Sequence, residues 1–118
     1  MTLHMVEVRV RDWERSRQWY ETFLGRSVAM IDETHQFALM DLPPVRLALK
    51  AGECVPGSTT LTLELPDLDA VTARLAAAGI VPVAAEKTSP EGYRRVVFTD
   101  PDGQRIILFQ WLNTGESS

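Results

Sequence analysis

The first apolar pattern in the chain is a strict alternation. Every second residue from Val6 to Val10 is valine, and Met5, Glu7 and Arg9 occupy the positions of opposite parity. Side chains of a strand point alternately to its two faces, so this period of two predicts a strand over residues 5–10 with one apolar face.

A helical pattern follows the strand. Asp12 is a residue type that caps helix N-termini, and Gly25 is suited to the left-handed position just after a helix end. Between them, apolar and small residues recur at helical spacing: Trp13, Ser16, Trp19, Tyr20, Phe23 and Leu24. We therefore expect an amphipathic helix whose aromatic side chains pack against a sheet.

Short strand-like segments complete the first half of the chain. They cover roughly residues 28–31, 36–40 and 46–50, with a break at Pro43-Pro44 between the last two. Residues 55–58 then have the composition of a linker.

The same order of patterns returns after the linker. Leucine occupies every second position from Leu61 to Leu65, Asp67 offers a second N-cap, and Gly79 a second helix end. The helical stripe between them consists of Leu68, Val71, Leu75 and Ala78. Further strands are expected near residues 81–84, 95–99 and 105–111.

This internal duplication predicts the fold class. The two N-caps, Asp12 and Asp67, are 55 residues apart, and the two helix ends, Gly25 and Gly79, are 54 apart. We expect an α+β fold of two tandem βαβββ modules, which form a curved, cleft-enclosing mixed sheet with helices outside. The whole chain, 1–118, is then one domain, with module one at about 1–54, module two at about 58–112 and a short C-terminal tail.

Composition narrows the function. The 118 residues are 45% hydrophobic and carry a formal net charge of −4, which argues against a binder of nucleic acid or of an anionic membrane surface. No apolar run approaches the length of a membrane span, charges come too early for a secretory signal, and the single Cys54 fits a reducing compartment. A cytoplasmic location is expected.

Three segments resemble the vicinal oxygen chelate superfamily, which includes glyoxalase I, extradiol dioxygenases, fosfomycin-resistance transferases and bleomycin-resistance proteins. The opening segment, 8–25, looks like the family's strand, D-x-x-x-S turn, aromatic helix and L-G stop. The second module opens in a familiar form at 63–71. The closing segment, 98–110, contains a turn similar to the family's DPDG hairpin at Asp100-Pro-Asp-Gly103.

The resemblance also implies where metal ligands would stand in the metal-binding members. The positions carried over are Met5, Leu47, Thr60 and Ile107, and none of them is a family ligand. A divalent site needs about three imidazole, carboxylate or thiolate groups. His4 is next to the first position but is expected on the opposite face, unless a bulge turns it. We expect no metal and no cofactor.

Alternation along the strands yields a set of candidate cleft residues. The predicted ligand-binding residues are Met5, Glu7, Arg9, Leu47, Leu49, Thr60, Thr62, Glu64, Arg105, Ile107, Phe109 and Trp111. Ionisable residues on a concave face need water, a partner or a ligand, and an aromatic ring on the last strand could stack on a planar ligand. For Leu47, Leu49 and Ile107, simple core filling is an equal alternative. Tyr93 is either a lid residue or an ordinary surface tyrosine.

Resemblance to the bleomycin-resistance branch suggests a function. It implies metal-independent binding and sequestration of a small, partly aromatic natural product such as an antibiotic, with no catalytic residues. One alternative is a metal-independent lyase, isomerase or cyclase that uses Glu7 or Glu64. Another is an enzyme that binds a divalent metal through displaced ligands. The resemblance further implies a homodimer whose clefts combine module one of one chain with module two of the other.

Overall fold

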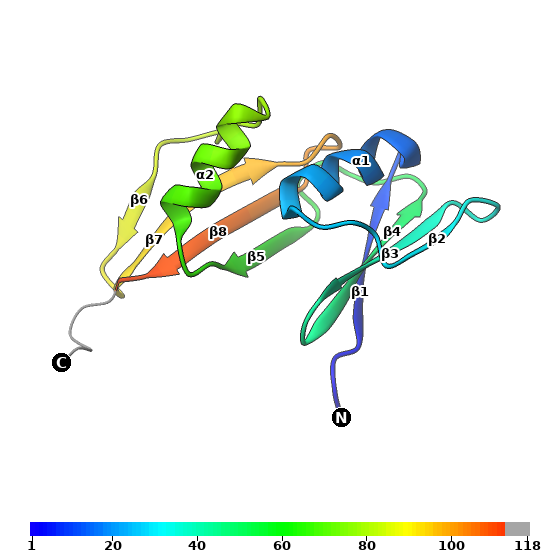
Figure 1. Ribbon diagram of the computed structural model, residues 1–118, viewed down its shortest axis with the longest axis horizontal. Coiled ribbons are helices and arrows are strands. Elements are labelled where there is room, and N and C mark those ends of the chain that lie inside the picture. The colour runs from blue at the N-terminus through cyan, green and yellow to red at the C-terminus, as the bar shows by residue number, and fades with distance from the viewer. Residues whose placement is uncertain (113–118) are drawn as a thin grey trace.

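The computed structural model describes residues 1–112, and the predicted C-terminal tail lies outside these residues. Each half of the chain forms one βαβββ module (Figure 1). The first module comprises β1 (Met5–Val10), α1 (Trp13–Leu24), β2 (Met30–Asp32), β3 (Phe37–Leu42) and β4 (Val45–Ala51). The second comprises β5 (Thr60–Glu64), α2 (Leu68–Ala77), β6 (Lys87–Ser89), β7 (Tyr93–Thr99) and β8 (Arg105–Trp111).

Each module builds its own four-stranded mixed sheet. The strand orders are β1-β4-β3-β2 and β5-β8-β7-β6, with β1–β4 and β5–β8 parallel and the other pairs antiparallel. The predicted α+β class and the tandem modules are confirmed. The two sheets are separate and open, so the described chain does not close into a barrel.

The predicted N-caps and the predicted end of α1 are also confirmed, whereas α2 ends at Ala77 with Ala78 as its C-cap, just before the predicted Gly79. The side chain of Asp12 accepts a hydrogen bond from the Arg15 amide at 3.2 Å, and Asp67 does the same for Ala70 at 3.0 Å. Gly25 has a φ of 66°, in the left-handed region where a glycine costs least. The local chemistry of the sequence therefore decides where both helices begin and where α1 ends.

The strand expected at residues 81–84 is misplaced. Pro82 has no N–H for a strand ladder, and Val81 and Val83 are 64% and 58% exposed. The amide of Val83 donates to the Val97 carbonyl at 2.9 Å, but the strand that pairs with β7 is Lys87–Ser89. A short polar edge strand thus replaces the apolar one that was predicted.

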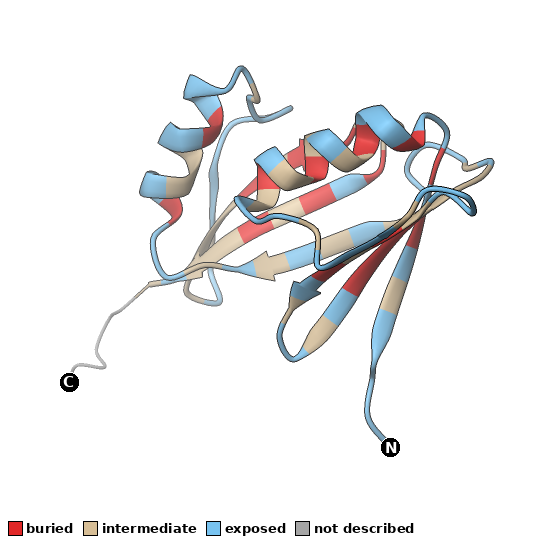
Figure 2. Cartoon of the chain, turned by 45° about the vertical axis from the view of Figure 1, so that its right-hand side comes forward, coloured by how far each residue is buried: buried red, intermediate tan, exposed pale blue. Residues whose placement is uncertain are grey.

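Both modules contribute to one hydrophobic core. The buried positions of the two helices lie on the sides that face the sheets (Figure 2). Helix α1 contacts both sheets, because the indole N–H of Trp13 donates to the Leu49 carbonyl at 3.2 Å while the ring of Phe23 meets that of Phe98 at 5.3 Å. Trp13, Tyr20 and Phe23 are buried, as the helical spacing predicted. No helix within residues 1–112 has the length and apolar character needed to cross a bilayer.

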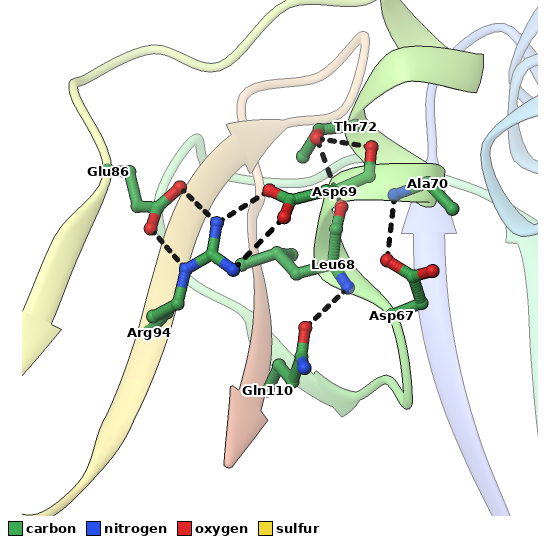
Figure 3. Close-up of polar contacts among 8 residues, drawn as sticks. All are labelled: Asp67, Leu68, Asp69, Ala70, Thr72, Glu86, Arg94 and Gln110. Carbon is green, nitrogen blue, oxygen red and sulfur yellow. Dashed lines mark hydrogen bonds and ion pairs between the residues drawn. The ribbon is translucent and has the colours of Figure 1, made fainter. Parts of the chain in front are cut away.

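An ion-pair bridge connects α2 to β7 and to the segment before β6. The Arg94 guanidinium bridges two carboxylates, with Nε 2.5 Å from Glu86 Oε2 and Nη2 2.6 Å from Asp69 Oδ1 (Figure 3). Nearby, the side chain of Gln110 accepts a hydrogen bond from the Leu68 amide at 2.7 Å, at the start of the helix. These contacts place α2 over β7 and β8 and leave the other face of that sheet open.

Candidate functional site

Each sheet has one face under a helix and one open face. Pairing registers assign every strand residue to a face, because residues opposite each other point the same way. Leu47 and Leu49 pair with Val6 and Val8, on the helix side, and are 3% and 0% exposed. Their predicted place among the ligand-binding residues of the open face is therefore wrong, and they belong to the core.

The open face of the first module carries three of the predicted residues. Met5, Glu7 and Arg9 point away from α1 and are exposed. Arg9 Nε lies 2.7 Å from Glu7 Oε2, so these two charges neutralise each other. The register places Arg46 beside Met5 on this face, where it forms an ion pair with Asp41 at 3.1 Å. The polar groups here are engaged with one another.

The open face of the second module carries the remaining predicted residues. They are Thr60, Thr62 and Glu64 on β5 and Arg105, Ile107, Phe109 and Trp111 on β8. Glu64 lies directly opposite Phe109, and Trp111 is 51% exposed. The first and second sets lie on different sheets, so Glu7 and Glu64 do not form the carboxylate pair that acid–base chemistry would need.

Three aromatic rings form a cluster on this second open face. Phe109, Trp111 and Tyr93, which we call the aromatic cluster, have ring centroids 5.4–5.6 Å apart in pairwise edge-to-face contacts. Such geometry is favourable for aromatic pairs and holds each ring in place. The cluster therefore presents a preorganised apolar surface that is open to solvent at Trp111.

Sequence reasoning missed the contribution of β7 to this face. The strand was expected to start at Arg95, but it starts at Tyr93, which pairs with Trp111. Tyr93 is thus a strand residue in contact with the site candidates, and Arg95 and Val97 point to the same open face. The alternation of Tyr93, Arg95 and Val97 along the chain was the available signal.

The positions of family metal ligands do not assemble a metal site. Met5 lies on one open face, Thr60 and Ile107 on the other, and none offers a donor suited to a divalent catalytic ion. Within residues 1–112, no three His, Cys, Asp or Glu side chains come together. His35 bonds instead to Asp32, at 2.8 Å in the β2–β3 turn. The residues present do not fit the metal that the superfamily uses.

A groove of about 740 Å³ runs between the modules. It is lined by the C-terminal end of α1, the β3–β4 turn, β5 and α2. Its walls are mostly apolar, with Thr62, Glu64, Arg26 and Arg74 as the polar members. Arg74 is already occupied, because it donates to the Thr22 and Phe23 carbonyls at the end of α1 at 2.7 and 2.9 Å. The groove therefore lies at the seam between the two modules.

A comparison with protein-family models identifies the family. The model described as glyoxalase-like domain matches residues 5–109, which is most of the chain. The chain belongs to the glyoxalase-like family of the vicinal oxygen chelate superfamily. A comparison with curated protein sequences finds no match.

Solved structures agree with this assignment. A glyoxalase/bleomycin resistance protein from Catenulispora acidiphila is 27% identical with a TM-score of 0.78, covering 92% of this glyoxalase-like chain and 98% of its own. A glyoxalase/bleomycin resistance protein/dioxygenase from Nocardioides is 25% identical with a TM-score of 0.79, covering 98% and 86%. Lactoylglutathione lyase from Agrobacterium tumefaciens, at 15% identity and a TM-score of 0.76, covers 92% of each chain and shares the fold alone.

Proposed function

We propose that this glyoxalase-like protein binds and sequesters a small, partly aromatic natural product, such as an antibiotic, without a metal ion and without transforming it. The aromatic cluster of Tyr93, Phe109 and Trp111 is the observation that carries the proposal. A preformed flat apolar surface suits a planar ligand. Sequestration removes free compound by mass action and depends on affinity and abundance alone.

The exposure of Trp111 supports a binding role for the cluster. The Trp111 ring is 51% exposed and so leaves apolar surface in water. A ligand that covers this surface gains about 25 cal/mol of binding free energy per Å² buried. Phe109 and Tyr93 are half-buried and support the indole from two sides. Trp111 is therefore the anchor in this proposal, and the other two rings hold it in position.

A second copy of the chain completes the site in our proposal. The open sheet face covers a ligand from one side only, whereas small-molecule sites usually enclose most of the ligand surface. Strands β1 and β5 are both sheet edges, and unpaired edges favour pairing. In a two-fold dimer, the open face of module one from the partner would cover the aromatic cluster, which gives two equivalent clefts.

Glu64 supports one alternative function. It lies on the open face opposite Phe109, next to the aromatic cluster, and no ion pair occupies its carboxylate within residues 1–112. A carboxylate at that place could act as a general base in a metal-independent lyase, isomerase or cyclase. Glu7 is less suited to this role, since Arg9 already holds it.

Calorimetric titration with a panel of aromatic natural products tests the proposal. Trp111→Ala should weaken binding by more than about tenfold, because truncating a buried aromatic anchor typically costs 2 kcal/mol or more. Trp111→Phe keeps a ring and is the matched variant that should retain most of the affinity. If Trp111→Ala binds as tightly as the parent protein, the aromatic cluster is not the site.

Mass spectrometry of the recovered ligand separates sequestration from catalysis. The proposal predicts that the ligand leaves the parent protein chemically unchanged. Conversion by the parent but not by Glu64→Gln would replace sequestration with the enzymatic alternative. Conversion that survives Glu64→Gln would contradict both sequestration and catalysis by Glu64.

A further inference from the structure

A second hollow lies beside the aromatic cluster, on the same open face. It measures about 230 Å³ and is walled by Lys87, Arg95 and Arg105 together with Val83, Ala84, Ala85 and Val97. We call it the basic pocket. Its only charged walls are cationic, although the chain as a whole has a formal net charge of −4.

The cations of the basic pocket lack the partners that most other cations of the protein have. Of the twelve lysine and arginine residues, five form ion pairs within residues 1–112: Arg9, Arg11, Arg17, Arg46 and Arg94. Two more, Arg74 and Lys50, donate to backbone carbonyls. Among residues 1–112, the side chains left without such a partner are Arg15, Arg26 and the three of the basic pocket.

Gathering three such cations in one hollow is electrostatically unfavourable without a counter-charge. Like charges repel, and the other walls of the hollow are apolar and offer no counter-charge. Arg95 is half-buried, whereas Lys87 and Arg105 are exposed. An anion in the hollow would relieve the repulsion and would accept charge-assisted hydrogen bonds from the guanidinium groups.

The basic pocket adjoins the aromatic cluster through one strand pair. Arg95 lies directly opposite Phe109, and Lys87 lies directly opposite Arg95. Neighbouring strands are about 4.8 Å apart, so a small ligand is long enough to contact both the Phe109 ring and the Arg95 guanidinium. On the other side of Phe109 stands Glu64, so the face is negative towards β5 and positive towards β7.

We propose that the ligand of this protein is an aromatic anion, whose carboxylate, sulfate or phosphate group binds in the basic pocket while its ring lies on the aromatic cluster. This inference rests on the proposed function and adds the charge and direction of the ligand. The anionic end points to Arg95, Arg105 and Lys87, and the end near Glu64 is neutral or cationic.

A matched pair of probes tests the charge requirement. 2-Naphthoate and 2-naphthamide have the same ring system and differ in the charge of one substituent. Calorimetric titration of the full chain should give about tenfold tighter binding of the naphthoate, which corresponds to about 1.4 kcal/mol. The double variant R95Q/R105Q should reduce that ratio towards one. Arg15→Gln changes the net charge on the exposed surface of α1 and should keep the ratio.

The outcomes distinguish this inference from the proposed function. Equal binding of both probes to the parent, or a ratio that survives in R95Q/R105Q, overturns the anion inference and leaves the aromatic site standing. If neither naphthalene binds, the probe is inorganic phosphate, followed by amide NMR shifts. Shifts confined to the surroundings of Lys87, Arg95 and Arg105 support the basic pocket while the aromatic function falls. Unmoved amides overturn both.

Discussion

The Tyr20 hydroxyl donates a hydrogen bond to Asp100 Oδ2 at 2.6 Å and thereby connects the helix of the first module to the β7–β8 turn of the second. Both side chains are buried. The other carboxylate oxygen of Asp100 accepts hydrogen bonds from the backbone amides of Asp102 and Gln104, at 2.9 Å each, and these bonds stabilise the turn. One carboxylate therefore fixes a local turn and the packing between modules.

Tyr20→Phe should lower the free energy of unfolding by about 1–3 kcal/mol, because it leaves a buried carboxylate oxygen without its donor. Urea denaturation at pH 7 measures the change. Tyr93→Phe makes the same chemical change on the open face and should have a much smaller effect. Equal losses in both variants would mean that the contact to Asp100 adds nothing specific.

Stability should fall at alkaline pH through the same tyrosine. Burial, and then the hydrogen bond to Asp100, raise the pKa of Tyr20 well above its ordinary value of 10.0. The unfolded chain releases this proton near pH 10 while the folded state keeps it. The stabilising contribution of protonated Tyr20 is thus complete below about pH 10. It is lost as pH rises towards the raised pKa, by at most about 1.4 kcal/mol per pH unit. Denaturation curves from about pH 9 to about pH 11, which spans the ordinary tyrosine pKa, measure this loss. The free energy of unfolding should decline less steeply with pH in Tyr20→Phe than in the parent protein.

Arg94→Gln should lower the melting temperature at neutral pH, with a smaller effect at high salt. Hydrogen bonds from Arg94 lower the pKa of Asp69 and that of Glu86. Their contribution to stability is present above the ordinary carboxyl pKa and is lost as pH falls through the lowered values. The difference between parent and variant should therefore shrink in acid. Arg95→Gln, one residue along on the opposite face, is the control; an identical loss there would contradict a specific role for the Arg94 bridge.

Purified protein should contain no stoichiometric divalent metal. Met5, Thr60 and Ile107 stand where the superfamily places ligands, and their side chains are poor donors for such an ion. Elemental analysis of protein prepared without added metal or an affinity tag measures this. One divalent ion per chain, whose removal by a chelator abolishes ligand binding, would contradict metal-independent function.

Sedimentation at micromolar concentration should give twice the 13.2 kDa mass of one chain. The proposed two-fold assembly uses the edges of β1 and β5 and covers the open faces. A mass of one chain throughout the concentration range would contradict the dimer and, with it, the enclosed cleft.

Alternation and capping chemistry specify most of the secondary structure from the sequence. The strand predicted at 5–10 and that at 105–111 have the bounds of β1 and β8, and both helices begin after the predicted Asp caps. These elements are set by local interactions, namely the period of side-chain facing and the hydrogen bonds of the caps. The repeat of those elements was sufficient to predict two βαβββ modules.

Tertiary structure decides which side chains of a buried strand pack against the helices. Leu47, Ala48 and Leu49 are all buried in the centre of a sheet, so apolar residues occupy both faces of β4 and alternation cannot choose between them. Only the register with Val6 and Val8 assigns the two leucines to the core.

The candidate site depends on pairing in the same way. Tyr93 meets Trp111, and Arg95 meets both Phe109 and Lys87, because β7 lies between β8 and β6. These residues are 8, 14 and 18 positions apart in the chain and become neighbours through the hydrogen-bonded strand pairs. The sequence by itself determined the modules and the alternation of their strands, which already places Arg105, Phe109 and Trp111 on one face. Strand pairing alone brought Tyr93, Arg95 and Lys87 beside them, because side-chain neighbours across a sheet are fixed by register and not by distance along the chain.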